Sequence, residues 1–193
     1  MHDYSMRGHP RERQIYYIAL LAFSLMPLLT TLAGWVGVTK SVGTFSVFAL
    51  LYVAFDKYGW RAKWVRKCLG FPDINGRWVC RGRQMNDQNE TVQEWQADIT
   101  IVQTWSRISV TLKTEHSTSL SGPASLCRED GHGFRLLYNY SNEPLPGEGQ
   151  LRPHHGTCDL VFTDACDSAT GVYFNDHNRL TFGRMTLTKQ NNS

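Results

Sequence analysis

An unbroken run of uncharged residues near the N-terminus limits the fold of this chain more than any other part of its sequence. No residue is charged from Ile15 to Val38. About 20 consecutive apolar residues cross the hydrocarbon core of a bilayer as a helix, so the run is long enough to span. Pro27 would kink such a helix without ending it, because a neighbouring helix can satisfy the freed carbonyl. The run therefore predicts a membrane-embedded helix.

A second uncharged run, shorter than the first, covers Ser41 to Phe55. The side chain of Lys57 can extend toward water, and the aromatic residues that follow it suit a bilayer interface, so this run can also span. The single Lys40 between the runs lies among glycines, which suits a tight turn. We expect a two-helix transmembrane hairpin over residues 15–60.

Charge is distributed unevenly along the chain and predicts the orientation of the hairpin. Nine Lys/Arg and three Asp/Glu lie in residues 1–67, whereas the remainder holds eleven and fourteen. Basic residues beside membrane helices mark the cytoplasmic side, so we expect residues 1–14 to be a cytoplasmic N-terminus and the chain after the hairpin to lie inside the cell. The basic flanks favour anionic lipid as a partner, and neither DNA nor RNA polymers are expected to bind.

Two alternatives to the hairpin use the same residues. A cleaved secretory signal could end near Ala33, but a second apolar run follows at once, and five cysteines without a CxxC spacing favour a reducing compartment. A single long tilted helix would place the rest of the chain across the membrane, against the basic stretch beside it.

Beyond a basic and aromatic connector at residues 61–72, the sequence pattern changes to an alternation of period two. Such alternation is typical of half-buried strands, and it predicts eight of them: Gly76–Arg83, Glu94–Trp105, Ile108–Lys113, Ser117–Cys127, Phe134–Tyr140, Thr157–Thr163, Gly171–Phe174 and Leu180–Lys189. We expect residues 73–190 to form an eight-stranded antiparallel barrel, since closure removes exposed edges. The start Gly76-Arg77-Trp78 is similar to the opening of lipocalin-like barrels.

Motifs for catalysis are absent from this sequence. It contains no Walker loop, nucleophile elbow or HExxH. His154 and His155 with Cys158 could be read as metal ligands, but adjacent residues on a strand point to opposite faces. We expect no enzyme activity, no metal and no cofactor.

A ligand site has more support than a catalytic one. Tyr138 and Tyr140 share one face of a predicted strand, and four arginines lie among aromatic strand residues: Arg81, Arg135, Arg179 and Arg184. Rings that stack on bases beside arginines that pair with phosphate are what a nucleotide pocket requires. Composition alone favours a plainer interpretation, with tyrosines as core residues and arginines on the outer wall.

Four segments on this architecture appear in an order that resembles a known family: Leu136-Leu137-Tyr138-Asn139-Tyr140-Ser141-Asn142-Glu143-Pro144, His155-Gly156-Thr157, Gly171-Val172-Tyr173-Phe174 and the RLTFGRMTL segment from Arg179 to Leu187. Together with two transmembrane helices and a barrel, they resemble the two-transmembrane, β-strand-rich effectors of CBASS anti-phage systems. Either Leu136 or Leu137 can lead the L-x-Y-x-Y pattern, so the sequence does not decide which face of that strand points into the barrel.

The resemblance implies a function. In such systems a CD-NTase makes a cyclic di- or oligonucleotide, the barrel of the effector binds it, and the effector oligomerises and disrupts the bacterial inner membrane, which aborts the infection. By motif position it implies eight ligand-binding residues: Tyr138, Tyr140, Asn142, His155, Thr157, Tyr173, Arg179 and Arg184. Two alternatives remain: a tethered lipocalin-like barrel that binds a lipid or other apolar ligand, and a scaffold that recruits another protein.

Overall fold

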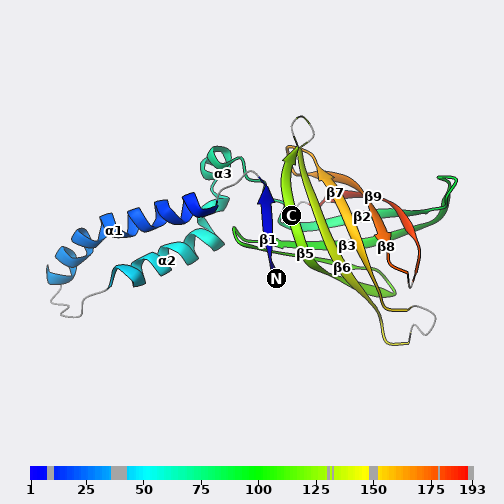
Figure 1. The fold of residues 1–193 in the computed structure, drawn as a ribbon, viewed down its shortest axis with the longest axis horizontal. Coiled ribbons are helices and arrows are strands. Elements are labelled where there is room, and N and C mark those ends of the chain that lie inside the picture. Colours follow the sequence, from blue (N-terminus) through cyan, green and yellow to red (C-terminus); the bar gives the residue numbers. More distant parts are fainter. Residues whose placement is uncertain are drawn as a thin grey trace. The chain divides into compact units, whose positions relative to one another are not determined.

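The computed structural model describes residues 1–7, 11–35, 43–129, 131, 133–147, 152–177 and 179–190. The chain forms two compact units. One contains His9–Gly70 and holds the helices. The other combines Met1–Gly8 with Phe71–Ser193 and holds the strands (Figure 1).

The helical unit contains α1 (Arg11–Trp35), α2 (Thr44–Lys57), the short 3-10 helix η1 (Gly59–Arg61) and α3 (Lys63–Leu69). Helix α1 continues through Pro27, and it contacts α2. Ala22 of α1 and Val47 of α2 are buried, whereas most large apolar side chains of α1 are exposed. Exposed apolar side chains on a long helix suit a lipid environment.

Among the described helices, only α1 is long and apolar enough to cross a membrane by itself, over Glu12–Trp35. The predicted second span corresponds to α2, which has 14 residues, fewer than the roughly 20 that a spanning helix needs. The structure therefore supplies one candidate span where the sequence predicted two. The turn predicted around Lys40 lies outside the described residues.

The strands run along nearly all of the second unit. They are β1 (His2–Arg7), β2 (Gly76–Met85), β3 (Thr91–Gln103), β4 (Arg107–Lys113), β5 (Ser117–Glu129), β6 (Gly133–Pro144), β7 (His154–Phe162), β8 (Ser168–Asn175) and β9 (Phe182–Lys189). All eight predicted strands are present with shifted ends, because each alternates buried and exposed side chains.

The nine strands pair in the order β1-β4-β3-β2-β9-β8-β7-β6-β5 and close into a barrel (Figure 1). The predicted count of eight was wrong, because β1 comes from the segment before the helices. The prediction of an antiparallel barrel was also wrong at one pair, since β1 runs parallel to β5. Strand β1 lies between β4 and β5 where the pairing of these two strands ends, beyond Leu120 of β5. The likeness to lipocalins stays a prediction.

One end of the barrel is plugged by large apolar side chains. Trp78 and Phe162 meet edge to face with their ring centroids 5.3 Å apart, and both are fully buried. Beyond them, the buried Gln103 side chain accepts a hydrogen bond from the backbone N–H of Ile74 (3.1 Å) and donates one to the Tyr4 hydroxyl (3.2 Å). This closed end therefore ties together β1, β3 and the segment before β2.

The barrel residues that precede and follow the helical unit in the sequence both lie at the closed end of the barrel. Arg7, the last residue of β1, is paired with Cys127, which lies opposite Arg135 near the start of β6. Phe71, where the chain re-enters the barrel, stacks on Trp105 with 4.4 Å between ring centroids.

Candidate functional site

A cavity of about 200 Å³ opens at the end of the barrel opposite the plug. Its wall comes from β2 to β9, and most of its lining is aromatic or polar and uncharged. The residues that line it are Gln84, Gln93, Trp95, Val110, Leu112, Thr114, His116, Ser117, Ser119, Tyr138, Tyr140, Asn142, His154, Cys158, Tyr173, Asn175, Arg179, Thr181 and Met185. No Asp or Glu is among these described residues.

Strand β6 contributes three side chains to the cavity, and its register settles the open question of the L-x-Y-x-Y pattern. Leu136 is fully buried, whereas Leu137 is 44% exposed. The inward series is therefore Leu136, Tyr138, Tyr140 and Asn142, because alternate residues of a strand share one face. Leu136 packs in the core, and the other three line the cavity.

Tyr138 forms the floor of the cavity together with sulfur-containing side chains. Cys158 donates a hydrogen bond to the Met185 sulfur at 3.8 Å. Burial raises the pKa of the Tyr138 phenol well above its ordinary value, and the neighbouring Cys158 adds to this. Burial also raises the pKa of the Cys80 and Cys158 thiols to about 12. These groups are neutral at physiological pH, so the thiols are poor nucleophiles and metal ligands.

Two pairs of hydrogen bonds fix the aromatic rings nearer the mouth. The Tyr140 hydroxyl donates to Asn175 Oδ1 at 2.5 Å, and Asn175 Nδ2 donates to the Thr181 hydroxyl at 2.6 Å. Trp95 Nε1 donates to the Tyr173 hydroxyl at 3.2 Å, with the two rings edge to face at 5.6 Å. Burial raises the pKa of both tyrosines. The rings are therefore neutral and held in place.

Asn142 and His154 face each other across β6 and β7 and present complementary hydrogen-bonding groups. Ser119 donates to Asn142 Oδ1 at 2.8 Å, so the amide N–H groups of Asn142 remain as donors. His154 Nδ1 lies 3.1 Å from the Arg152 carbonyl, which can only accept, so this nitrogen carries the proton. Burial lowers the pKa of His154. Its Nε2 is therefore an acceptor beside the Asn142 donors, a pair that suits a base edge.

Positive charge reaches the cavity through Arg179, in the turn between β8 and β9. Its side chain lines the mouth and is exposed. Its backbone N–H donates to the Asp176 carbonyl at 3.0 Å, which holds the turn. The guanidinium is close enough to lower the pKa of Tyr140 and Tyr173 against the larger effect of burial.

Of the eight residues predicted to bind ligand, the structure brings five together in the cavity: Tyr138, Tyr140, Asn142, Tyr173 and Arg179. His155 and Thr157 lie on the outer wall, where they line a second pocket of about 450 Å³ that shares Tyr140 and Asn175 with the cavity. Arg184 also points outward, and its guanidinium donates to Asn89 Oδ1 at 3.3 Å. The alternation of side chains along β7 explains why His155 and Thr157 lie outside the cavity, since they alternate with the inward His154 and Cys158.

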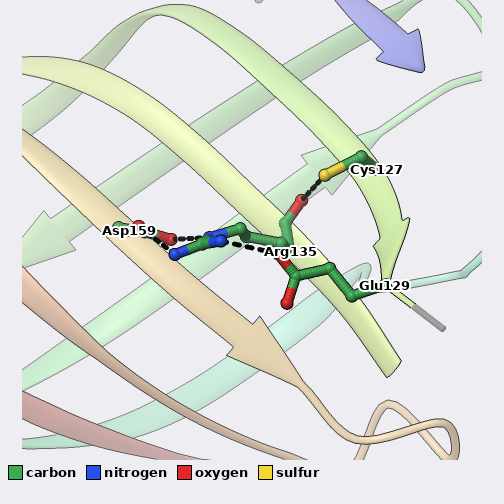
Figure 2. A network of polar contacts seen from close by, with 4 residues as sticks. All are labelled: Cys127, Glu129, Arg135 and Asp159. Carbon is green, nitrogen blue, oxygen red and sulfur yellow. Dashed lines mark hydrogen bonds and ion pairs between the residues drawn. The ribbon is translucent and has the colours of Figure 1, made fainter. Parts of the chain in front are cut away.

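Arg135, one of the four arginines noted in the sequence, also lies on the outer wall (Figure 2). It makes a bidentate pair with Asp159 at 2.8 and 2.9 Å and a further hydrogen bond to Glu129 at 2.6 Å. These carboxylates, Asp159 first, raise the pKa of the guanidinium. Arg135 therefore links β5, β6 and β7 and is not placed to bind a ligand in the cavity.

Sequence reasoning missed most of the other lining residues, among them Trp95, His154 and Asn175. Trp95 had a detectable signal, because it alternates with Ala97 and Ile99 on an apolar face. His154 was noted only as a metal ligand. Among the described residues, no group of three or more His, Cys, Asp or Glu is placed to hold a metal ion.

Comparison with known proteins adds two findings. A family described as "Cap15, cyclic dinucleotide receptor domain" matches residues 69–189, which include every residue of the cavity. A protein of Yersinia aleksiciae named CD-NTase-associated protein 15 is 38% identical over 143 residues, covering 74% of this chain and 67% of that protein.

Proposed function

This chain belongs to the Cap15 family of CBASS effectors, and from that premise we propose that a cyclic dinucleotide binds in the cavity at the mouth of its barrel. The messenger comes from a CD-NTase. Its binding drives oligomerisation of the effector and disruption of the bacterial inner membrane, which aborts the phage infection.

The lining of the cavity is the observation that carries this proposal. Neutral aromatic rings at its walls can stack on a base, and the Asn142–His154 pair can read a base edge. Arg179 supplies positive charge at the rim, where a phosphate would lie. No carboxylate among the described lining residues would repel an anionic ligand.

The volume of the cavity suggests which part of the messenger enters the barrel. About 200 Å³ is less than the roughly 300–1,000 Å³ of common small-molecule pockets. One base therefore enters the barrel, while the ribose-phosphate ring and the second base stay at the mouth near Arg179. The second base is then available to another copy of the protein.

The site acts by binding rather than by catalysis. Burial keeps the Tyr138 phenol and the Cys158 thiol protonated, so neither is an activated nucleophile. No cofactor is needed for a ligand that only shifts a conformational or assembly equilibrium. The messenger must bind the assembled state more tightly than the free protomer to shift it.

The pairing of β1 bears on how the helical unit meets the membrane. Because β1 precedes α1 and belongs to the same barrel as β2 to β9, its pairing supports a topology in which both flanks of the helical unit lie on one side of the membrane. A single crossing would separate β1 from the strands with which it pairs. We therefore keep the two-helix hairpin as a proposal, with α1 and α2 both inserted and both termini in the cytoplasm.

An apolar ligand, as in a lipocalin-like barrel, is the second candidate, because most of the exposed lining surface of the cavity is apolar. Lipid binding needs a dry apolar lumen, whereas the mouth presents an amide, an imidazole and a guanidinium from Asn142, His154 and Arg179. These groups would lose hydration without gaining partners from a lipid chain.

Expression in bacteria with and without a cyclic-dinucleotide synthase tests the proposed function. We expect dye entry across the inner membrane only when the synthase is active and residues 15–55 are intact. Leakage without the synthase, or none with it although the protein is present in the membrane, would contradict the proposal.

A further inference from the structure

Three glycines occupy inward-facing strand positions at the level of the cavity. Each is paired with an aromatic residue on a neighbouring strand. The register pairs Gly82 with Trp95, Gly156 with Tyr140 and Gly183 with Tyr173. A Cβ atom at any of these glycines would overlap the ring of its partner. Each ring therefore occupies the space that a side chain on the opposite strand would fill.

This arrangement keeps three large rings against the wall instead of across the lumen. The pairs involve β2 with β3, β6 with β7 and β8 with β9, so they are distributed around the barrel. Nearer the plug, inward positions such as Ile99, Leu136 and Leu187 carry large side chains and are fully buried, and the lumen is packed. The cavity begins where glycines replace them.

Hydrogen bonds hold the rings in these positions. Tyr140 is bound to Asn175, and Trp95 is bound to Tyr173. These side chains, on β3, β6 and β8, thereby fix the width of the opening before any ligand arrives. A preformed opening lowers the ordering cost of binding.

We infer that Gly82, Gly156 and Gly183 are specificity-determining residues of the ligand site: they hold Trp95, Tyr140 and Tyr173 against the wall and leave a slot the width of a planar base. The inference rests on the proposed function, since it assigns the slot to a base of the messenger. It predicts that the glycines affect affinity only through their partner rings.

Gly82 allows the cleanest test. At Gly156 and Gly183 a Cβ would also meet backbone oxygens, of Phe174 and Arg83 respectively, so substitution there would distort the sheet. At Gly82 the three nearest atoms all belong to the Trp95 ring. An added methyl must therefore move the ring by about 1.5 Å to reach ordinary contact, and movement toward the lumen would narrow the opening of the cavity.

The experiment is a double-mutant cycle on the full-length protein in detergent. Titration calorimetry measures the affinity for the best ligand from a panel of 3′,3′-cyclic dinucleotides carrying adenine, guanine, cytosine and uracil. Gly82→Ala should weaken binding by about tenfold or more, because the displaced Trp95 ring obstructs the opening that the base enters. Trp95→Leu should weaken it less, and Gly82→Ala on the Trp95→Leu background should change it by less than about twofold.

Gly122→Ala is the matched control, because its Cβ would lie 3.7 Å from the Asn139 carbonyl oxygen, an ordinary contact; it should bind as the wild type does. A Gly82→Ala effect of equal size on both backgrounds would overturn the inference, as would an unchanged affinity in folded Gly82→Ala and Gly82→Val proteins.

A graded series at Gly82 decides the question if Trp95→Leu binds nothing measurable. Affinity must then fall from the wild type to Gly82→Ala and fall further in Gly82→Val, because the larger side chain moves the Trp95 ring farther into the lumen. The reverse order would overturn the inference. A wild type that binds no member of the panel instead refutes the proposed function.

Discussion

At the scale of single residues, Arg179 and Arg184 carry the same charge but lie on opposite sides of the barrel wall. Arg179 lines the mouth of the cavity, whereas Arg184 contacts Asn89 outside it. Replacing Arg179 with Gln should weaken messenger binding by about 10- to 100-fold, because a charge-assisted hydrogen bond to phosphate contributes about 1.5–3 kcal/mol. Titration of the purified protein at two salt concentrations measures both the affinity and its salt dependence.

Arg184→Gln is the control for this prediction, since it removes the same charge from the outer wall. Its affinity should match that of the wild type. Equal losses in the two variants would indicate that the barrel attracts the messenger by net charge rather than through the rim of the cavity.

His154 predicts a pH dependence of folding stability. Burial lowers its pKa in the folded state below the ordinary value near 6.5, so the unfolded chain binds the proton more readily. Its contribution is therefore fully present above about pH 6.5 and is lost as the pH falls below that value. Thermal unfolding at pH 7.5 and 5.5 should show a larger decrease for the wild type than for His154→Gln. A His154→Gln protein with an undiminished decrease would refute the assignment.

The sequence predicted which types of residue line the site better than it predicted which of their side chains point into the barrel. Tyr138, Tyr140 and Tyr173 were assigned by motif position, like the other predicted site residues, and as rings they also suit stacking. Adjacent Leu136 and Leu137 are both apolar and do not decide which face of β6 points inward. His155 and Thr157 were assigned by motif position, which does not tell whether a side chain points into or out of the barrel. The glycines opposite the rings could not be recognised without the register between strands.

At the scale of elements, β1 is the strand whose contribution is easiest to isolate. Its Tyr4 is buried, and β1 pairs with residues 124–127 of β5. A fragment of residues 73–193 lacks this strand and exposes an unpaired edge, so it should aggregate. Residues 1–7 joined by a flexible linker to residues 71–190 should instead give a soluble monomer by gel filtration.

Tyr4→Ala in the full-length protein tests the same strand with a point change. Large-to-small substitution of a buried aromatic residue costs about 3–5 kcal/mol, which should lower the unfolding temperature clearly. Tyr58→Ala, at an exposed position of the helical unit, serves as a comparison and should leave the unfolding of the barrel unchanged. A stable, monomeric 73–193 fragment would show that β1 is dispensable.

The strands of the barrel were predictable because one face of each is buried and the other is solvated, which produces a period of two. Strand β1 was not, because it has only two inward apolar residues, Tyr4 and Met6, and stands beside basic residues that indicate a membrane flank. Its partner strands lie more than a hundred positions away in the chain, and no local pattern encodes that pairing.

At the scale of the whole molecule, the closed barrel constrains the membrane topology. Because β1 and β2 to β9 share one barrel, the proposed insertion into the inner membrane predicts that reporters fused to the N-terminus and the C-terminus lie on the same side of it. A reporter that is active only in the periplasm should be inactive at both ends, while a cytoplasmic reporter should be active at both. Opposite results at the two ends would exclude the hairpin and the pairing of β1 together.

The proposed function depends most on where the messenger binds, and a structure of the full-length protein with its tightest-binding cyclic dinucleotide measures this directly. We predict one base inside the mouth of the barrel, in contact with Tyr140 and Tyr173, and a phosphate beside Arg179. A messenger bound only on the outer wall, or only between copies without entering the cavity, would contradict the account.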